Sequence, residues 1–410
     1  MVDMRVSWVT ETAIVLAAVL ALAAPPCLAQ SSAASSTQRD TAFALEQQGR
    51  FADAEAAWQS ILKTHPDNAE AFAHLGFLES HQQHYPQAVT FYRRAFALNP
   101  SMPGLQLNFG LALFKAGDLK QAARAFEPLY RKTAPDSDDA QRLRLLLGMA
   151  YYGAAEYAAA VPYLRDAMAR DPQNLPYRLV LAHSCLWSKQ YKCVLDVYHQ
   201  ILTLNAESAE ADMLAGEAYD SMLDHADAIQ QFRNAVKADP KEPGVHFGLG
   251  YLLWCQSQFD EAAEQFQLET ENAPNDAESL AYWADSNVRL NRPDVARPIL
   301  EKALRLNSKQ ELPWLDLGII DATAGHNDDA LREFKTAARL TPADIQVHWR
   351  LGRLYQSMGD RALAQAEFAK TKNLTQAADK TVMEKLRASH AQDAPANANA
   401  ASSNSQQPNP

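Results

Sequence analysis

The sequence contains little glycine, with 15 glycines in 410 residues, and no segment alternates apolar and polar residues between glycine-rich turns. An ordinary β-sheet protein needs both features, so their scarcity argues against a sheet. Alanine, leucine, glutamate and glutamine are abundant instead, and these residues favour helices. The composition therefore predicts an all-α protein.

A basic stripe is also missing. The formal net charge is −11, with 38 lysines and arginines against 49 aspartates and glutamates. Because nucleic-acid binding depends on clustered positive charge, this balance predicts that no nucleic acid is a partner.

Catalytic motifs are absent from the sequence as well. We find no nucleophile elbow, no Walker phosphate loop and no His-Glu-x-x-His zinc motif. His81 and His84 are close in sequence, and His74 is expected on an adjacent face of the same helix as His81. No carboxylate or cysteine completes a ligand set with them. The sequence therefore predicts no enzyme activity, no metal site and no cofactor.

The N-terminus has the features of a signal peptide. Arg5 precedes an apolar run of twelve residues, 13–24, which Pro25 and Pro26 interrupt before the small residues that end at Ala29. This order is typical of a signal peptide, and a spanning helix would need about 20 apolar residues. We predict a signal peptide over residues 1–29, a disordered leader over residues 30–40, and export to the periplasm or cell envelope, with secretion as a further possibility.

Three cysteines remain after cleavage at Ala29: Cys185, Cys193 and Cys255. An exported compartment permits disulfides, so Cys185 and Cys193 could be bridged. Buried free thiols are nevertheless the commoner state, and a bridge is not the expected one.

The dominant pattern is an internal repeat of 34 residues, which is clearest over residues 69–100. With residue 69 as position 1, position 8 is small, position 20 is nearly always alanine, position 24 is large and position 32 is often proline. The small residues at position 8 are Gly76, Gly110, Gly148, Ala182, Gly216, Gly250, Ala284, Gly318 and Gly352. The large residues at position 24 are Trp58, Tyr92, Phe126, Leu164, Tyr198, Phe232, Phe266, Leu300, Phe334 and Phe368.

This pattern resembles the tetratricopeptide repeat (TPR) over about residues 35–376, with repeats that start near residues 35, 69, 103, 141, 175, 209, 243, 277, 311 and 345. The resemblance implies a right-handed α-solenoid of about ten stacked helix-turn-helix units over residues 41–376. The first repeat has a polar start and no good first helix. A capping helix is expected over residues 377–390, and a disordered tail over residues 391–410.

In the family that the repeat resembles, the first helix of each unit, helix A, lines a concave groove and contacts the ligand at positions 2, 5, 6, 9, 12 and 13. Aromatic residues at these positions favour an extended peptide or an amphipathic helix, although each could instead pack on the next helix. Asp285 and Asp316 also occupy such positions. The candidate groove residues are His74, Phe77, His81, Asn108, Phe114, Tyr152, His183, Trp187, Phe247, Tyr251, Trp254, Tyr282, Arg289, Trp349, Arg350 and Arg353.

The resemblance implies a non-enzymatic scaffold that binds a protein partner in this groove and meets membranes only through that partner. The alternative is an envelope scaffold for polysaccharide export or glycan binding, because aromatic side chains also stack on sugar rings. Position 5 carries no lysine and position 6 no asparagine ladder, so neither the clamp for chaperone tails nor the groove of sugar-transferase repeats is matched.

Overall fold

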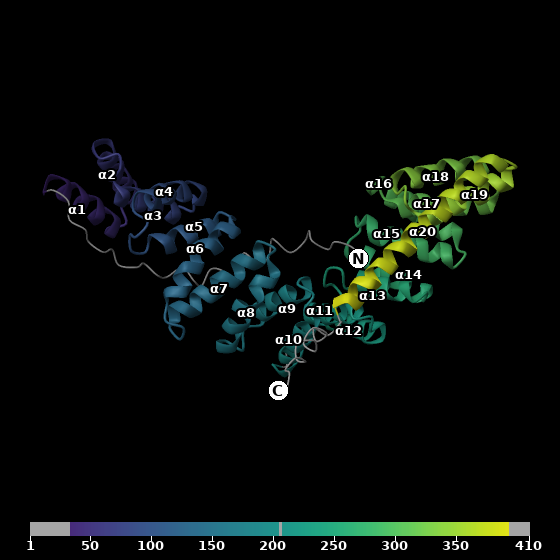
Figure 1. Ribbon diagram of the computed structural model, residues 1–410, viewed down its shortest axis with the longest axis horizontal. Coiled ribbons are helices and arrows are strands. Elements are labelled where there is room, and N and C mark those ends of the chain that lie inside the picture. Colours follow the sequence, from purple (N-terminus) through teal and green to yellow (C-terminus); the bar gives the residue numbers. More distant parts are fainter. Residues whose placement is uncertain (1–32, 205–206, 393–410) are drawn as a thin grey trace, which may run out of the picture. The chain divides into compact units, whose positions relative to one another are not determined.

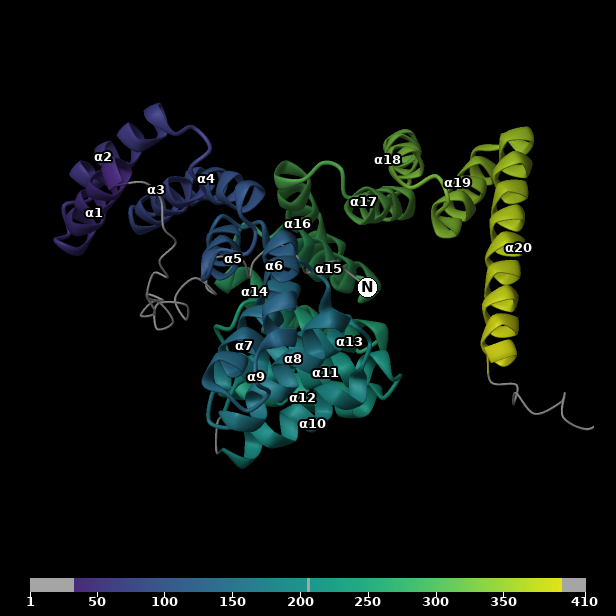
Figure 2. The ribbon, with the colours of Figure 1, turned by 60° about the vertical axis from the view of Figure 1, so that its left-hand side comes forward.

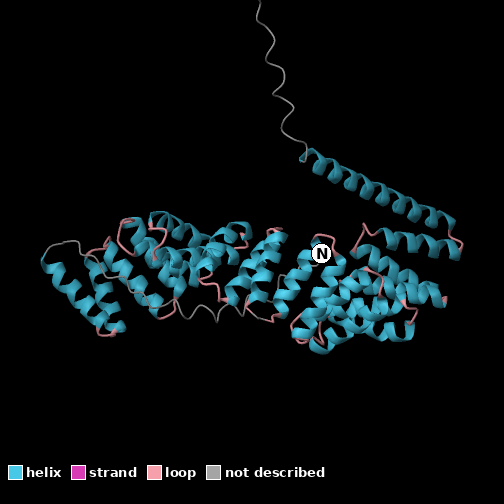
Figure 3. Cartoon of the chain, turned by 90° about the horizontal axis from the view of Figure 1, so that it is seen from below, coloured by secondary structure: helices cyan, strands magenta, loops and turns pink. Residues whose placement is uncertain are grey.

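A computed structural model describes residues 33–204 and 207–392 (Figure 1). These residues form twenty α-helices and no strand (Figure 3), which confirms the all-α prediction. The predicted signal peptide lies outside the described residues, as do residues 393–410 of the predicted tail. Within the described part of the chain, every helix is too short or too polar to cross a membrane.

The chain divides into two compact units, an N-terminal unit (Met1–Ala238) and a C-terminal unit (Asp239–Pro410). The helices of the N-terminal unit are α1 (Ala33–Gln47), α2 (Phe51–Thr64), α3 (Ala69–His81), α4 (Tyr85–Leu98), α5 (Leu105–Lys115), α6 (Leu119–Lys132), α7 (Asp138–Gly153), α8 (Tyr157–Arg170), α9 (Leu175–Trp187), α10 (Tyr191–Thr203), α11 (Ala209–Ser221) and α12 (His225–Ala238). Those of the C-terminal unit are α13 (Val245–Cys255), α14 (Phe259–Asn272), α15 (Ala277–Arg289), α16 (Pro293–Leu306), α17 (Glu311–Ala324), α18 (Asn327–Leu340), α19 (Ile345–Met358) and α20 (Arg361–Gln392). Each predicted repeat corresponds to one pair of helices, of which the odd-numbered member is helix A.

Local sequence signals set where these helices begin and end. Several odd-numbered helices follow an Asn, Asp or Ser whose side chain accepts a hydrogen bond from a backbone N–H of the first turn: Asn68, Ser137, Asn174, Ser208, Asp276 and Asp344. Such caps satisfy donors that a helix start would leave unpaired. A proline stands two residues after the end of α2, α4, α8, α12, α14 and α18, where it prevents the helix from continuing.

Within each unit the helix pairs stack on one another. In the N-terminal unit each even-numbered helix packs on the next odd-numbered helix, from α2 on α3 to α10 on α11. In the C-terminal unit the same order runs from α14 on α15 to α18 on α19, and Figure 2 shows α17 to α20 side by side in chain order. Neighbouring A helices also touch, as α9 does α11 and α15 does α17. These contacts place the helix-A positions of successive repeats next to one another.

The contact inside each pair follows the predicted register. A Cβ on Gly76 would lie 2.8 Å from the ring of Tyr92, and a Cβ on Gly216 would lie 2.7 Å from the ring of Phe232. The large residue at position 24 therefore fills the space that the missing side chain at position 8 leaves. Both rings are almost fully buried, so these aromatics form the core of the repeats.

The turn between the two helices of a pair holds one residue, at position 15, in the left-handed region. Four of these turns have glycine there, but six have another residue: Gln83, Ala155, Lys189, Leu223, Ser257 and Asn291. A residue with a side chain is less stable in this region by about 1 kcal/mol. Leu223, with φ 65°, is also 78% exposed, so no packing compensates for that cost.

The N-terminal end differs from the prediction. Helix α1 begins at Ala33, so residues 33–40 of the expected disordered leader are helical and the first repeat has a complete helix A. Ala42, at the small position 8, is fully buried, and Nε of Arg39 lies 2.7 Å from Oε2 of Glu70. The polar composition concealed these contacts, because the stabilising partners belong to the following helices.

The C-terminal end differs too, since no separate capping helix exists. Helix α20 runs without a break from Arg361 to Gln392 (Figure 2), because Gln376 stands where other repeats have the terminating proline. Val382 and Met383, the apolar side chains that a cap would bury, are about half exposed. This part of α20 therefore does not cover the last repeat as a cap would.

A disulfide joins Cys185 on α9 to Cys193 on α10, with the two Cα atoms 5.8 Å apart. The expectation of free thiols at these two positions is therefore wrong. The short turn between the two helices places positions 11 and 19 of the same repeat opposite each other, close enough for the bridge to form.

Candidate functional site

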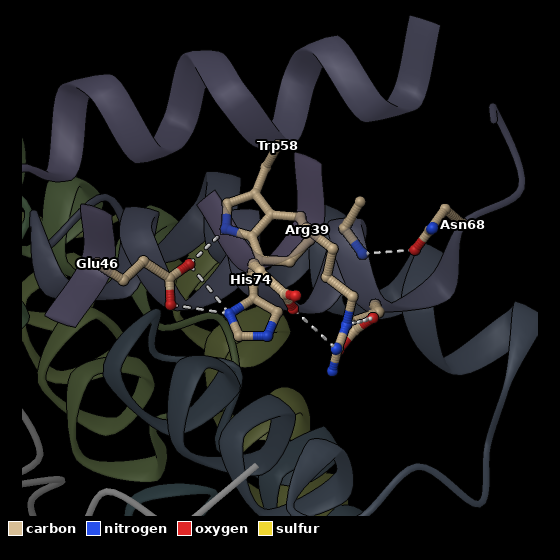
Figure 4. A network of polar contacts seen from close by, with 8 residues as sticks. Arg39, Glu46, Trp58, Asn68 and His74 are labelled. Atoms are coloured by element: carbon tan, nitrogen blue, oxygen red, sulfur yellow. Dashed lines mark hydrogen bonds and ion pairs between the residues drawn. The ribbon is translucent and has the colours of Figure 1, made fainter. Parts of the chain in front are cut away.

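The helix-A face consists of the side chains at positions 2, 5, 6, 9, 12 and 13 of the odd-numbered helices. His74 on α3 lies on this face but is held by the chain itself (Figure 4). Its Nδ1 is 2.9 Å from Oε2 of Glu46, and its ring stacks on Trp58 with the centroids 4.4 Å apart. Trp58 donates from Nε1 to Oε1 of the same buried glutamate, at 2.5 Å. Glu46 was missed in the sequence because the first repeat was not credited with a helix A.

The other candidate groove residues near the N-terminus do not form a single cluster. Phe77 is 37% exposed, and the exposed ring of His81 lies 6.4 Å from it and 4.2 Å from Phe51. Phe114 is half-buried against the core between α4 and α7, and Asn108 is half-buried on the same helix. Phe77 and His81 are therefore the open side chains of this group.

Four rings from α7, α8 and α9 gather in the middle of the N-terminal unit, and we name them the Trp187 cluster: Tyr152, Tyr157, His183 and Trp187. The Trp187 centroid lies 4.6 Å from that of Tyr157, 5.0 Å from His183 and 5.9 Å from Tyr152. Burial raises the pKa of Tyr152, and the neighbouring Tyr157 and Glu210 raise it further. Trp187 remains 37% exposed, so the indole is accessible to a ligand.

Two carboxylates of α11 lie beside this cluster. Oε1 of Glu210 is 2.8 Å from Nε2 of His183, and Glu217 is half-buried about two turns further along the helix. Burial raises the pKa of Glu217 to about 7, although the charge of His183 acts in the opposite direction. Neither glutamate is among the residues predicted from the sequence, although they occupy positions 2 and 9 of the repeat that starts at residue 209. The same register would have found them.

The C-terminal unit has its own aromatic group, which we name the Tyr282 cluster: Phe247, Tyr251, Trp254 and Tyr282. The Tyr282 centroid on α15 lies 5.9, 5.6 and 5.3 Å from those of Phe247, Tyr251 and Trp254 on α13. The structure thus brings together four residues that the sequence selected from two repeats. All four are half-buried, so they pack on one another more than they face solvent.

Asp285 connects this cluster to a cation. The indole Nε1 of Trp254 donates to Oδ2 of Asp285, and Nε of Arg289 donates to the same oxygen at 2.7 Å. The Arg289 guanidinium also lies over the Trp254 ring, 5.0 Å from its centroid. Asp285 is 3% exposed, so these two donors compensate for the burial of its charge.

Asp316 on α17 is the neighbour of this network and is 1% exposed. Burial raises the pKa of Asp316 well above its usual range, and the Asp285 carboxylate raises it further. Burial and the adjacent carboxylate therefore both favour the protonated form of Asp316.

Trp349 on α19 is the most exposed aromatic candidate of the C-terminal unit, at 42%. The guanidinium groups of Arg350 and Arg353 lie 5.5 and 5.6 Å from its centroid. This end of the helix-A face is therefore cationic. Among the residues that the structure describes, no group of three His, Cys, Asp or Glu side chains is arranged to hold a metal ion.

Comparison with known proteins identifies the repeats. The model of the tetratricopeptide repeat matches residues 40–103, 107–175 and 213–277, so the chain contains tetratricopeptide repeats. Human superkiller complex protein 3 is 24% identical over 271 residues, which are 64% of this chain and 17% of that protein. The Arabidopsis thaliana protein CTR9 homolog is 21% identical over 309 residues, 73% of this chain and 28% of that protein. The chain thus spans less than a third of the length of these two curated relatives.

Solved structures with a similar fold include Pseudomonas aeruginosa pilF and YrrB, a protein described as a TPR protein. The pilF structure is 17% identical, with a TM-score of 0.43, and the match covers 50% of this chain and 92% of that one. The YrrB structure is 19% identical, with a TM-score of 0.36, over 43% of this chain and 91% of that one.

Proposed function

We propose that this chain of tetratricopeptide repeats is a non-enzymatic scaffold that binds a protein partner through its helix-A face. The contrast between two sets of aromatic residues carries the proposal. The aromatics at position 24 are buried, apart from the half-buried Phe368 of the last repeat, whereas Phe77, Trp187 and Trp349 on the helix-A face are 37%, 37% and 42% exposed. Folding does not require the exposed set, and interfaces use large aromatic side chains as anchors.

The arrangement favours an elongated ligand. Neighbouring A helices touch, as α9 and α11 do, so the helix-A positions of successive repeats form a row within each unit. In the N-terminal unit the exposed anchors Phe77 and Trp187 lie on α3 and α9, three repeats apart. A peptide or helical segment is long enough to reach both anchors of such a row, whereas a compact ligand would meet one.

Export to the periplasm or cell envelope is the second part of the proposal. It is supported by the apolar run over residues 13–24 and by the Cys185–Cys193 disulfide, since disulfides persist in oxidising compartments. Mass spectrometry of the purified protein from an exporting bacterial host should give a mature N-terminus at Gln30. A protein that retains Met1 in the membrane fraction would contradict cleavage.

The binding proposal is tested with the mature chain immobilised and exposed to envelope extract, in parallel with a glycan array. We expect proteins to be retained and sugars to be ignored, and we expect retention to fall in the double variant Trp187→Ala, Trp349→Ala. The matched control is Leu202→Ala, Val295→Ala, because these exposed apolar residues lie on even-numbered helices, away from the helix-A face. Equal retention by both double variants, or binding to sugars alone, would overturn the proposal.

A further inference from the structure

The Trp187 cluster combines an exposed aromatic surface with the neighbouring carboxyl groups of Glu210 and Glu217. The ring faces of Trp and Tyr attract cations within about 6 Å of their centroids. Each of the four rings has its centroid within 6.5 Å of at least two others, and Trp187 keeps more than a third of its surface open. The cluster can therefore accept a cationic group above an indole face.

Among the described residues, the basic side chain beside these carboxylates is His183, whose Nε2 lies 2.8 Å from Oε1 of Glu210. Helix α11 contains no lysine or arginine, and Arg178, the single arginine of α9, is bonded to the Pro172 carbonyl and to Gln200. Among the residues that the structure describes, Glu217 has neither a hydrogen bond nor an ion pair. A half-buried carboxyl without a donor is unfavourable, and a bound donor would remove that penalty.

We infer that the Trp187 cluster and Glu217 hold a lysine or arginine side chain of the bound segment, with its aliphatic stem on the indole and its charge toward the carboxylate. The inference rests on the proposed function and adds the chemistry of the partner to it. An acidic segment is disfavoured at this place, because Glu210, Glu217 and Asp220 all belong to the same helix.

Proton release is a signature of this arrangement. Because the pKa of Glu217 is about 7 in the free protein, the group is partly protonated at neutral pH. A bound cation favours the ionised carboxylate, so binding should lower that pKa and release a fraction of a proton. A merely structural role of Glu217 would not produce this release.

The first experiment selects binders from a random 12-residue peptide library, displayed on phage, with the immobilised mature chain. We expect enriched peptides to carry a lysine or arginine, and we expect this preference to be lost in Glu217→Gln. The control is Glu264→Gln, which removes the same charge from an exposed site on α14 and should keep the preference.

The second experiment measures the selected peptide by calorimetry at pH 7 in two buffers of different ionisation enthalpy. We expect about tenfold weaker binding for Glu217→Gln, for Trp187→Leu and for a peptide with norleucine in place of the basic residue. Proton release should occur in the unsubstituted chain and vanish in Glu217→Gln. Circular dichroism of both variants checks that each is folded.

The outcomes separate the two proposals. Enriched peptides without a basic residue, or a basic preference that survives in Glu217→Gln, would overturn the cation site and leave the scaffold function standing. Enrichment no greater than on the bare support would overturn both.

Discussion

The helix-A faces of the two units differ in how they accommodate a carboxyl group at position 9 of a repeat. In the N-terminal unit Trp187 is open, and Glu217 has no hydrogen-bond donor among the residues that the structure describes. In the C-terminal unit Trp254 and Arg289 both donate to Asp285, so the corresponding carboxylate is satisfied internally. The repeat register decides where a side chain lies, and the neighbouring helix decides whether a ligand is still needed there.

Overpacking of position 8 should give the largest effect on the free energy of unfolding. The same variants show whether the two units unfold separately. Gly216→Leu and Gly318→Leu place carbon atoms where Cβ alone would already lie 2.7 and 2.5 Å from the rings of Phe232 and Phe334. We expect each variant to lose about 3 kcal/mol of unfolding free energy. Hydrogen exchange followed by mass spectrometry should show loss of protection in the substituted unit. Unchanged thermal unfolding in both variants would contradict the register.

Removal of the internal acceptor tests the contrast between the units directly. Asp285→Asn deprives Arg289 and Trp254 of a charged acceptor inside the C-terminal unit, and we expect a loss of about 2 kcal/mol. Glu217→Gln removes a carboxylate that has no donor, and its effect on stability should stay within about 0.5 kcal/mol. Urea unfolding of both variants measures the difference. Equal destabilisation would show that Glu217 has a structural role after all.

The units should also differ in how their stability depends on pH. Burial and then the Asp321 carboxylate raise the pKa of Glu333 to about 7, and burial raises that of Glu311 to about 7. Burial alone would raise the pKa of Asp321, but hydrogen bonds from Arg297 and His326 lower it, so Asp321 stays ionised near neutrality. Together with Asp316, the C-terminal unit thus has three carboxyl groups with a raised pKa near α17. Around the helix-A face of the N-terminal unit, the carboxyl groups with a raised pKa are those of Glu217 and Asp212.

A carboxyl with a raised folded-state pKa stabilises the fold in its protonated form. This stability is complete below the unfolded pKa of about 4.5 and is lost as pH rises through about 7. We therefore expect both units to be less stable at pH 8 than at pH 5.5, with the larger loss in the C-terminal unit. Glu333→Gln should reduce the difference by about 1 to 2 kcal/mol. Calorimetry at the two pH values provides the measurement, and a C-terminal unit that gains stability toward pH 8 would refute the assignment.

The fold could be predicted because its contacts are short-range and repeated. Gly216 and Phe232 belong to one repeat, and the same pairing occurs in repeat after repeat, so the register is visible in the sequence. The clustering of Phe247 and Tyr251 with Tyr282 followed from that register as well. Once the A helices are adjacent, equivalent positions have to meet.

The chemistry of the face was harder to predict, because it depends on side chains from different repeats. The repeat pattern does not show that Asp285 accepts hydrogen bonds from both Trp254 and Arg289. Nor does it show that Glu217 accepts none from the described residues. The helical state of residues 33–40 and the continuous α20 were not predicted either. The first depends on contacts with the following helices, and the second depends on the absence of a terminating proline. The repeat pattern is therefore enough to predict the fold, whereas the pairing of polar groups across repeats becomes visible only in the structure.

The smallest expected effect comes from the turns, where the two units offer opposite substitutions. Leu223, at φ 65° in the N-terminal unit, occupies the position that Gly325, at φ 81°, occupies in the C-terminal unit. Leu223→Gly relieves backbone strain and should stabilise the protein by about 1 kcal/mol, less the entropy that glycine adds to the unfolded chain. Gly325→Ala introduces the same strain, and since no atom lies within 4 Å of the new Cβ, its loss of about 1 kcal/mol should come from the backbone alone. Urea unfolding should give changes of opposite sign, and a destabilised Leu223→Gly would mean that the exposed leucine side chain makes a stabilising contact in solution.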